Sequence, residues 1–294
     1  MSIIEALIQG IVQGLTEFLP VSSSGHLSLY QHFTGLSGES GLMFSIILHV
    51  GTLVAVFGAF YRLIWDLILE FFRMIRDIFT GKFSFKNRNA ERNMIFMIIL
   101  ALVPLAIIYF LLGDVYKAVS SDHDIMVEGF CFLLTATLLF LADRKTNGTK
   151  TNGQITPRDA LVIGTLQAVA PLPGVSRSGS TIASGLMCGL SKETAVAFSF
   201  ILGIPAILGG SVMELKDVTS ADLNLPISVI LVGLITSAVV GFLSIKMVQW
   251  LLKSDRFKIF AIYTLILGII VIGVSTYEYI SGSPIVFAFG NAVA

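Results

Sequence analysis

Charged residues are scarce in this chain of 294 residues: only 13% are Asp, Glu, Lys or Arg, about half the share that is usual in soluble domains. The formal net charge is zero, so the overall electrostatics favours no nucleic-acid partner. There are only two cysteines, Cys131 and Cys188, each alone in an apolar stretch. This isolation argues against a cysteine metal site, and we interpret both as small buried hydrophobic residues. No Lys or Arg precedes Arg62, so we expect no cleaved signal peptide.

Apolar residues make up 55% of the chain, and the mean hydropathy is +0.86. They occur in blocks of about 20 residues, the length that crosses a bilayer as a helix, which a large soluble core would not produce. The sequence therefore predicts an all-α polytopic membrane protein, a single membrane domain over residues 1–294. Six stretches are long and apolar enough to span: roughly 42–60, 94–112, 125–142, 195–213, 226–245 and 257–277.

Three other segments do not fit simple spans. Residues 62–80 alternate apolar and charged side chains at helical spacing, which predicts an amphipathic helix at the membrane interface or continuing the preceding span. Residues 3–34 and 157–190 are apolar but interrupted by Pro, Gly and Ser. Each is too short for two spans of about 20 residues and a turn. We therefore expect two re-entrant helical hairpins, whose irregular backbone lines a cavity.

The loop charges predict the orientation. Segments 61–92, 143–158 and 246–258 together hold 15 of the 19 basic residues, which places them in the cytoplasm by the positive-inside rule. The first hairpin then enters from the outside and the second from the cytoplasm, as in an inverted repeat.

Sequence similarity within the chain supports this repeat. Residues 10–48, moved by 154 positions onto 164–202, match identically at 14 of 39 positions without a gap. Ser-x-Ser-Gly and Gly-Leu-Ser-x-Glu are shared between the halves, which apolar composition does not explain. We expect one repeat over about 3–142 and another over about 157–280, with a site near the membrane midplane where the halves meet.

The first hairpin is interrupted by Pro20, and costly polar side chains surround the break. Gln13 and Glu17 are four residues apart and share a helix face. Glu17 suits a divalent metal, proton transfer or a counter-charge to an arginine, a structural ion pair being the plainer alternative. Hydroxyls and backbone amides at a helix start bind anions, and Ser23 and His26 could pair as nucleophile and base. The alternative is a serine-rich helix cap with a packing histidine. Both interpretations concern the same run, Ser22, Ser23, Ser24, Gly25 and His26.

The second hairpin carries the stronger signal, because it places Arg177 inside an apolar sequence. Arginine holds phosphate oxygens in a bidentate manner, the neighbouring hydroxyls add donors, and Gly174 allows backbone to approach a ligand. The two hairpins together suit a diphosphate. The hydroxyl residues are Ser176, Ser178 and Thr181.

These motifs resemble the undecaprenyl pyrophosphate phosphatases, the bacitracin-resistance (BacA/UppP) family. The family pattern of Glu/Gln-x-x-x-Glu, Pro-Val-Ser-Ser-Thr/Ser-Gly-His and Pro-Gly-x-Ser-Arg-Ser-x-x-Thr is met at 13–17, 20–26 and 173–181. The resemblance implies a bacterial cytoplasmic-membrane enzyme, dimeric and dependent on a divalent cation (Mg²⁺ or Ca²⁺). It would hydrolyse undecaprenyl diphosphate on the outer side and so recycle the lipid carrier of cell-wall synthesis.

The resemblance also implies roles for the motif residues. Glu17 would handle a metal or a proton, Ser23 with His26 would attack phosphorus, and Arg177 with its neighbouring hydroxyls would hold the diphosphate. Gln13 is the permitted variant of the first acidic position, which argues against a mechanism that needs two carboxylates there. Two alternatives stay open: a water activated by His26 or Glu17 as nucleophile, and a lipid-phosphate transporter built on the same repeats. A purely structural protein does not explain polar residues in both hairpins.

Overall fold

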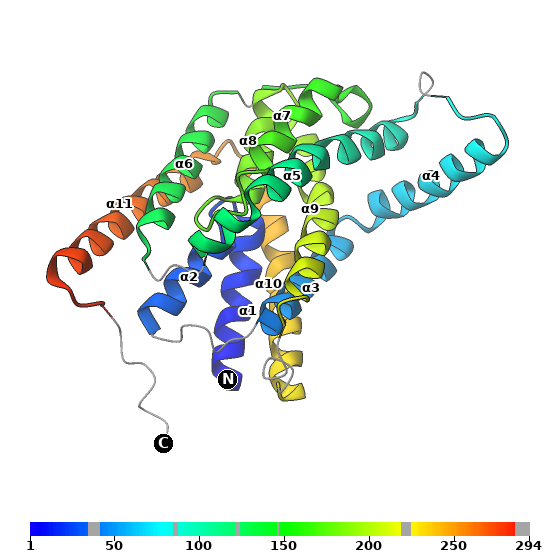
Figure 1. Cartoon of the computed structure of the whole chain (residues 1–294). Coiled ribbons are helices and arrows are strands. Elements are labelled where there is room, and N and C mark those ends of the chain that lie inside the picture. Colours follow the sequence, from blue (N-terminus) through cyan, green and yellow to red (C-terminus); the bar gives the residue numbers. More distant parts are fainter. Residues whose placement is uncertain (35–41, 85–87, 121–123, 146, 219–224, 286–294) are drawn as a thin grey trace.

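The computed structural model describes residues 1–34, 42–84, 88–120, 124–145, 147–218 and 225–285. Over these residues the protein is helical, without a named β-strand (Figure 1). The helices, in chain order, are α1 (Ile3–Phe18), α2 (Ser23–Thr34), α3 (Leu42–Ala59), α4 (Tyr61–Phe79), α5 (Ala90–Ser120), α6 (Met126–Asp143), the short 3₁₀ helix η1 (Asn152–Gln154), α7 (Pro157–Gln167), α8 (Arg177–Met187), α9 (Lys192–Glu214), α10 (Ile227–Lys253) and α11 (Lys258–Ser281).

The structure confirms the prediction of an all-α polytopic membrane protein. Among the described residues, six helices are long and apolar enough to cross a membrane: α3, α5, α6, α9, α10 and α11. Each covers one predicted span, but α5 and α10 are longer than expected. Polar ends such as those of α5 lower a hydropathy average without stopping a helix, so the pattern underestimates helix length.

Both interrupted segments are pairs of helices joined by a break. In the first, α1 and α2 flank residues 19–22; in the second, α7 and α8 flank residues 168–176. The paired helices pack against each other, as hairpins do. Their entry from opposite faces of the membrane stays a prediction from loop charge. Of the internal sequence matches, those at 35–41 lie outside the described residues.

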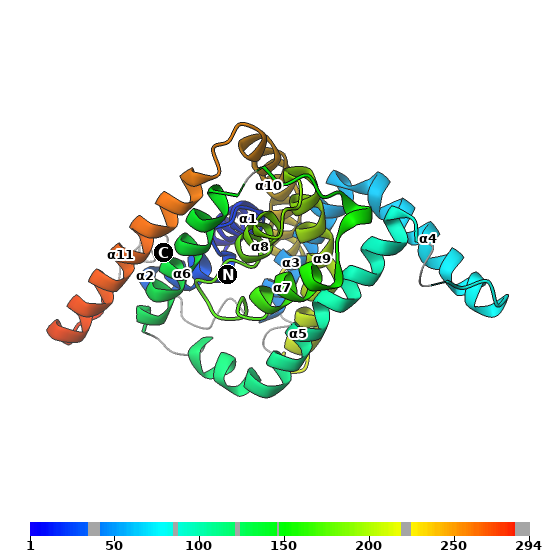
Figure 2. The same ribbon diagram turned by 90° about the horizontal axis from the view of Figure 1, so that it is seen from above.

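The two halves of the chain are interlocked. Helix α1 packs along α10 of the second half, while α7 and α8 pack against α5 and α6 of the first half. Seen from above, α1 and α8 lie in the middle of the bundle, between α6 and α11 on one side and α5 on the other (Figure 2). Neither broken helix is therefore supported only by its own half.

Helix α4 is the amphipathic helix that the sequence predicts, and it extends away from the body of the bundle (Figure 1). Trp65, Phe72 and Phe79 are 60%, 62% and 86% exposed, whereas Ile64 and Met74 face the protein. The exposed apolar stripe has the character of a surface that faces lipid.

A buried ion pair fixes α4 to the start of α5. Glu70 is 2% exposed, and its Oε1 accepts a hydrogen bond from Arg92 Nε at 2.6 Å. Arg92 also donates to Asp77 at 2.7 Å, and Asn89 donates to Glu70 at 3.0 Å. Burial raises the pKa of the Glu70 carboxyl, but these hydrogen bonds and the charge of Arg92 outweigh it and hold the pKa below its usual value.

We expect Glu70→Gln to lower the free energy of unfolding by about 3 kcal/mol, because it leaves the Arg92 charge without its buried partner. The stability supplied by Glu70 should be present above about pH 4.3 and be lost as the pH falls through the lowered pKa of the folded state. Thermal unfolding in detergent, measured over this pH range, checks both.

Arg73→Gln is the matched control, because Arg73 is 59% exposed and lies 3.6 Å from the same carboxylate. An exposed partner contributes less than about 1 kcal/mol. Equal losses in both variants would contradict the assigned role of the Arg92 pair.

Candidate active site

The breaks of the two helix pairs meet through glycine. An added Cβ at Gly25 would lie 2.8 Å from the Gly174 Cα, so the two segments touch at their backbones. Gly174 has a φ of 92°, and a side chain there would also lie 2.7 Å from the Cys131 Cβ of α6. Ser22, at the other break, holds a φ of 72° without being glycine. Such backbone costs about 1–3 kcal/mol and is typical of functional sites.

The helices that follow the two breaks, α2 and α8, begin with the same pattern of hydrogen bonds. The Ser22 and Ser176 hydroxyls accept from the amides of Gly25 and Gly179, three residues on, at 3.3 and 3.0 Å. Each hydroxyl also lies 3.3 Å from the hydroxyl two residues on, Ser24 or Ser178. The shared Ser-x-Ser-Gly motif thus corresponds to a shared local geometry.

Glu17, near the end of α1, is the residue on which the two motifs converge. Its side chain is 6% exposed. Arg177 Nη2 donates to its Oε1 at 2.6 Å, across 160 residues of sequence. Its Oε2 accepts from Gln13 Nε2 at 3.0 Å and from the Ser23 hydroxyl at 2.8 Å. Ser23 and Arg177 are equivalent positions of the internal repeat, and here both donate to one carboxylate.

Helix α9 holds the other side of Arg177. Arg177 Nη1 donates to the Ser199 carbonyl at 3.3 Å, and the Thr181 and Ser199 hydroxyls lie 2.6 Å apart. The guanidinium lies so close to Gly203 that a Cβ at this position would overlap it. A methyl group at residue 203 would therefore push the guanidinium away from the position in which it reaches Glu17.

The hydroxyls of the second motif mainly hold the backbone around the two breaks in place. Ser176, Ser178 and Thr181 are each 1% exposed. Ser178 donates to the Leu19 carbonyl at the first break at 3.2 Å, and Thr181 donates to the Arg177 carbonyl at 2.9 Å. By contrast, Ser24 of the first motif is exposed. All the predicted site residues thus lie at or beside the two breaks.

The structure does not show the hydrogen bond that we expected between Ser23 and His26. The Ser23 hydroxyl is bound to Glu17, while His26 Nδ1 lies 2.7 Å from the Ser22 carbonyl and His26 Nε2 lies 2.7 Å from the Tyr263 hydroxyl. Helical spacing of three residues brings two Cβ atoms near each other but does not decide the directions of the side chains.

Two further residues join the site from spans that carry no motif. His49 Nε2 of α3 lies 3.9 Å from Glu17 Oε2. The sequence did not indicate a role for Thr135 of α6. Its hydroxyl donates to the Gly174 carbonyl at 3.0 Å and accepts from the Ser176 amide at 3.1 Å. A lone threonine inside a span gives no sequence signal.

The donor set fits a divalent cation only in company with a substrate. Within the part of the chain that the structure describes, no three His, Cys, Asp or Glu residues gather as metal ligands. Gln13 Oε1 is buried without a hydrogen-bond partner beside Glu17. Mg²⁺ is commonly bound by one or two carboxylates together with substrate phosphates. Gln13 and Glu17 supply oxygen atoms for such a shared ion but not for a cage made of protein alone.

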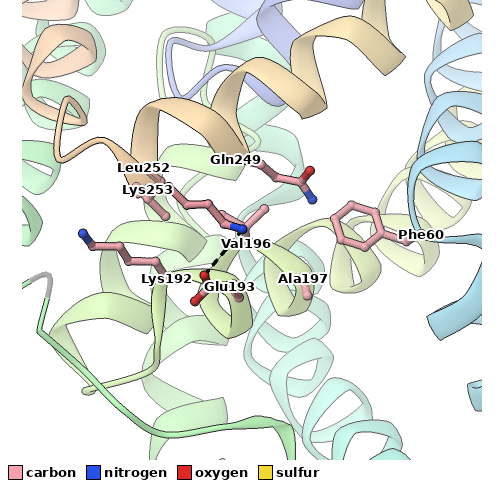
Figure 3. A pocket seen from close by; sticks show the side chains of 8 residues that line it. All are labelled: Phe60, Lys192, Glu193, Val196, Ala197, Gln249, Leu252 and Lys253. Carbon is pink, nitrogen blue, oxygen red and sulfur yellow. Dashed lines mark ion pairs between the residues drawn. The ribbon is translucent and has the colours of Figure 1, made fainter.

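A separate pocket of about 230 Å³ lies between the start of α9 and the end of α10, over Phe60 (Figure 3). Its lining includes no residue of either motif. Lys253 pairs with Glu193 at 3.8 Å, and Lys192 pairs with Asp255. Both lysines at this pocket are thus paired with carboxylates, and the pocket shares no lining residue with the site at Glu17.

Comparison with known proteins agrees with the motifs. The family model described as bacitracin resistance protein BacA matches residues 6–270. This chain belongs to the BacA family. It is 41% identical over 275 residues to the undecaprenyl-diphosphatase of Methanosphaera stadtmanae, covering 92% of this chain and 98% of the relative. Proteins of the same name from Alkaliphilus metalliredigens and Methanobrevibacter smithii are 39% and 41% identical, with 92% of this chain covered and 98% and 97% of theirs.

We expect Thr135→Val to lower the free energy of unfolding by about 2 kcal/mol, because it leaves the Gly174 carbonyl and the Ser176 amide buried without a partner. The valine side chain has nearly the same shape, so packing is kept. Thermal unfolding measures the loss.

Thr137→Val, two residues further along α6, is the matched control. Thr137 donates only to the Leu133 carbonyl of its own helix, on the exposed face. Its replacement should change the stability by less than about 0.5 kcal/mol. Equal stability of the two variants would contradict the role of Thr135 at the second break.

Proposed function

We propose that this protein is an integral membrane phosphatase that hydrolyses undecaprenyl diphosphate to undecaprenyl phosphate and inorganic phosphate. The observation that carries the proposal is the convergence on Glu17 of a nucleophile and a cation: the Ser23 hydroxyl at 2.8 Å and the Arg177 guanidinium at 2.6 Å. A binding site needs only the cation and hydrogen-bond donors. A hydroxyl bound to a carboxylate supplies in addition a nucleophile and a proton acceptor.

We assign Glu17 the role of base, because the Ser23 hydroxyl donates to its Oε2. Ser23 Oγ gives its proton to Glu17 Oε2 and bonds to the terminal phosphorus, the bond from this phosphorus to the bridging oxygen breaks, and undecaprenyl phosphate leaves. Water then cleaves the phosphoserine: its oxygen bonds to phosphorus, the bond from phosphorus to Ser23 Oγ breaks, and Ser23 Oγ takes back the proton held by Glu17. The water gives up one proton to His26 Nε2, and phosphate leaves. In the competing path Glu17 or His26 takes the proton of a water that attacks phosphorus directly. A phosphate transferred to Ser23 distinguishes the two paths.

Arg177 supplies the charge for the phosphate oxygens. Nη2 is held by Glu17, whereas Nη1 makes only the longer bond to Ser199, so Nη1 is the donor most easily turned to a substrate. A divalent cation bound with the diphosphate would neutralise further phosphate charge, with Glu17 and Gln13 as its protein ligands.

We place this reaction in the cytoplasmic membrane, with the basic loops on the cytoplasmic side. The site would open to the outer side, as the resemblance to the family implies. There the reaction would recycle the lipid carrier for peptidoglycan synthesis and confer resistance to bacitracin. We extend the proposal to a homodimer, which the mass of the detergent-solubilised protein tests.

Purified protein should release phosphate from undecaprenyl diphosphate when Mg²⁺ or Ca²⁺ is present and stop when the cation is chelated. Glu17→Gln should lower kcat/KM by at least about 100-fold, because the amide cannot take the Ser23 proton. Arg177→Lys should cost about as much, since lysine cannot hold both the carboxylate and a phosphate in a planar geometry.

Glu193→Gln is the control at the separate pocket, where the carboxylate is 66% exposed, and it should keep wild-type activity. Lipid binding by folded protein without release of phosphate would overturn the phosphatase in favour of a lipid-phosphate transporter.

Gly203→Ala should lower activity by about 10-fold or more, because the methyl group takes the place of the Arg177 guanidinium and moves the arginine away from Glu17. Phosphate release measures the effect, and thermal unfolding shows whether the variant is folded.

Gly209→Ala, on the same helix, has open space around the added methyl group and should keep full activity. Normal activity of Gly203→Ala would show that Arg177 need not contact Glu17 for the reaction.

A further inference from the structure

His26 is held by two short hydrogen bonds, neither of which involves another candidate for catalysis. One joins Nδ1 to the Ser22 carbonyl and the other joins Nε2 to the Tyr263 hydroxyl, both at 2.7 Å. Tyr263 comes from α11, which packs against α6; α2, α6 and α11 lie on the same side of the bundle in both views (Figures 1 and 2). No sequence motif singles this tyrosine out.

The two partners determine where the protons lie. A carbonyl only accepts, so Nδ1 carries a hydrogen and donates it to Ser22. In a neutral imidazole Nε2 is then the acceptor, and the Tyr263 hydroxyl donates to it. If Nε2 gains a proton, the same hydroxyl accepts from it, because a phenol both donates and accepts. Tyr263 therefore remains bonded to His26 in both protonation states.

Aromatic contacts fix the ring in this orientation. The Tyr263 ring stacks on the His26 ring with centroids 5.8 Å apart and planes at 10°. Phe132 of α6 contacts the same His26 ring edge-on, with centroids 5.5 Å apart and planes at 82°. Gly25, the residue before His26, touches Gly174 at the second break. The imidazole is thus anchored to the backbone that joins the two motifs. Tyr263 is itself 44% exposed, so core packing alone does not account for the placement of its hydroxyl.

We propose that Tyr263 is a positioning residue for the phosphatase reaction: its hydroxyl holds His26 in the Nδ1–H tautomer and reverses its hydrogen bond when Nε2 takes up or gives back a proton. This inference rests on the proposed function. It assigns His26 the second step: Nε2 takes a proton from the water that attacks the phosphoserine and gives it to solvent after phosphate has left. Glu17 receives the Ser23 proton in the first step and returns it to Ser23 Oγ in the second. Tyr263 itself contacts neither the nucleophile nor Arg177 among the bonds of the described residues.

The test begins with Tyr263→Phe, which keeps the ring and its stacking and removes only the hydroxyl. We expect kcat for undecaprenyl diphosphate to fall by about 10-fold with KM changed less than about 2-fold, because substrate binding does not use this group. The pH–rate profile should move in the variant. Tyr277→Phe, on the same helix and 59% exposed, is the matched control and should leave kcat, KM and the profile unchanged.

A double-mutant cycle shows whether Tyr263 acts through His26. If it does, Tyr263→Phe should cost nothing further in a His26→Ala background. An equal loss of kcat in both backgrounds would overturn the proposal, as would wild-type kcat and pH profile in Tyr263→Phe.

A measurement without catalysis separates this inference from the proposed function. The chain has only 4 histidines, so ¹⁵N-labelled imidazoles give few nitrogen signals. Wild-type protein should show His26 as the Nδ1–H tautomer with Nε2 hydrogen-bonded, and Tyr263→Phe should lose that bond, while Tyr277→Phe keeps it. An unchanged His26 spectrum in Tyr263→Phe would refute the positioning role even if the protein proves to be a phosphatase. A lost bond in a protein that releases no phosphate would support the contact and refute only its use in hydrolysis.

Discussion

The ion pair between Glu17 and Arg177 is the interaction on which the site depends. It joins two residues 160 positions apart, each placed at the break of an otherwise apolar helix pair, and both side chains are largely shielded from solvent. Removing two such charges from water costs several kcal/mol each, and the pair alone repays this only with good geometry and further hydrogen bonds. Gln13, Ser23 and the Ser199 carbonyl supply those bonds. The same partners are the groups from which a phosphoryl-transfer site is built.

Interlocking of the two halves makes this arrangement stable. Helix α1 packs against α10 of the second half, and α8 packs against α6 of the first, so each break is held by helices of both halves. Backbone contact at Gly25 and Gly174 then sets the distance between the motifs, and Thr135 bonds the buried backbone groups of the second break that have no helical partner. Irregular backbone inside a membrane protein is tolerated only when its polar groups are bonded in this way. Stability and catalysis therefore depend on many of the same residues.

Much of this architecture was predictable, because the bilayer imposes simple rules. The six spans, the amphipathic α4 and the two broken helix pairs follow from hydropathy, charge and the positions of Pro and Gly. The candidate site was predictable as a set of residues, since charged groups in apolar sequence rarely lack a function. The partners within the set were not. Ser23 binds Glu17 and His26 binds Tyr263, and three-residue spacing on a helix gave no sign of either contact.

The sequence by itself determined the class of protein, the number of spans and the two motifs, since these depend on local hydropathy and on residue types that a membrane excludes unless they are used. Only the tertiary structure decided which side chains meet. Tyr263, Thr135 and Gly203 lie in plain apolar spans. Tyr263 and Thr135 act through contacts with residues at least 39 positions away. Gly203 acts through its approach to Arg177, 26 positions away. Such contacts depend on how helices pack, and the packing directions of buried side chains are a property of the whole bundle rather than of any segment.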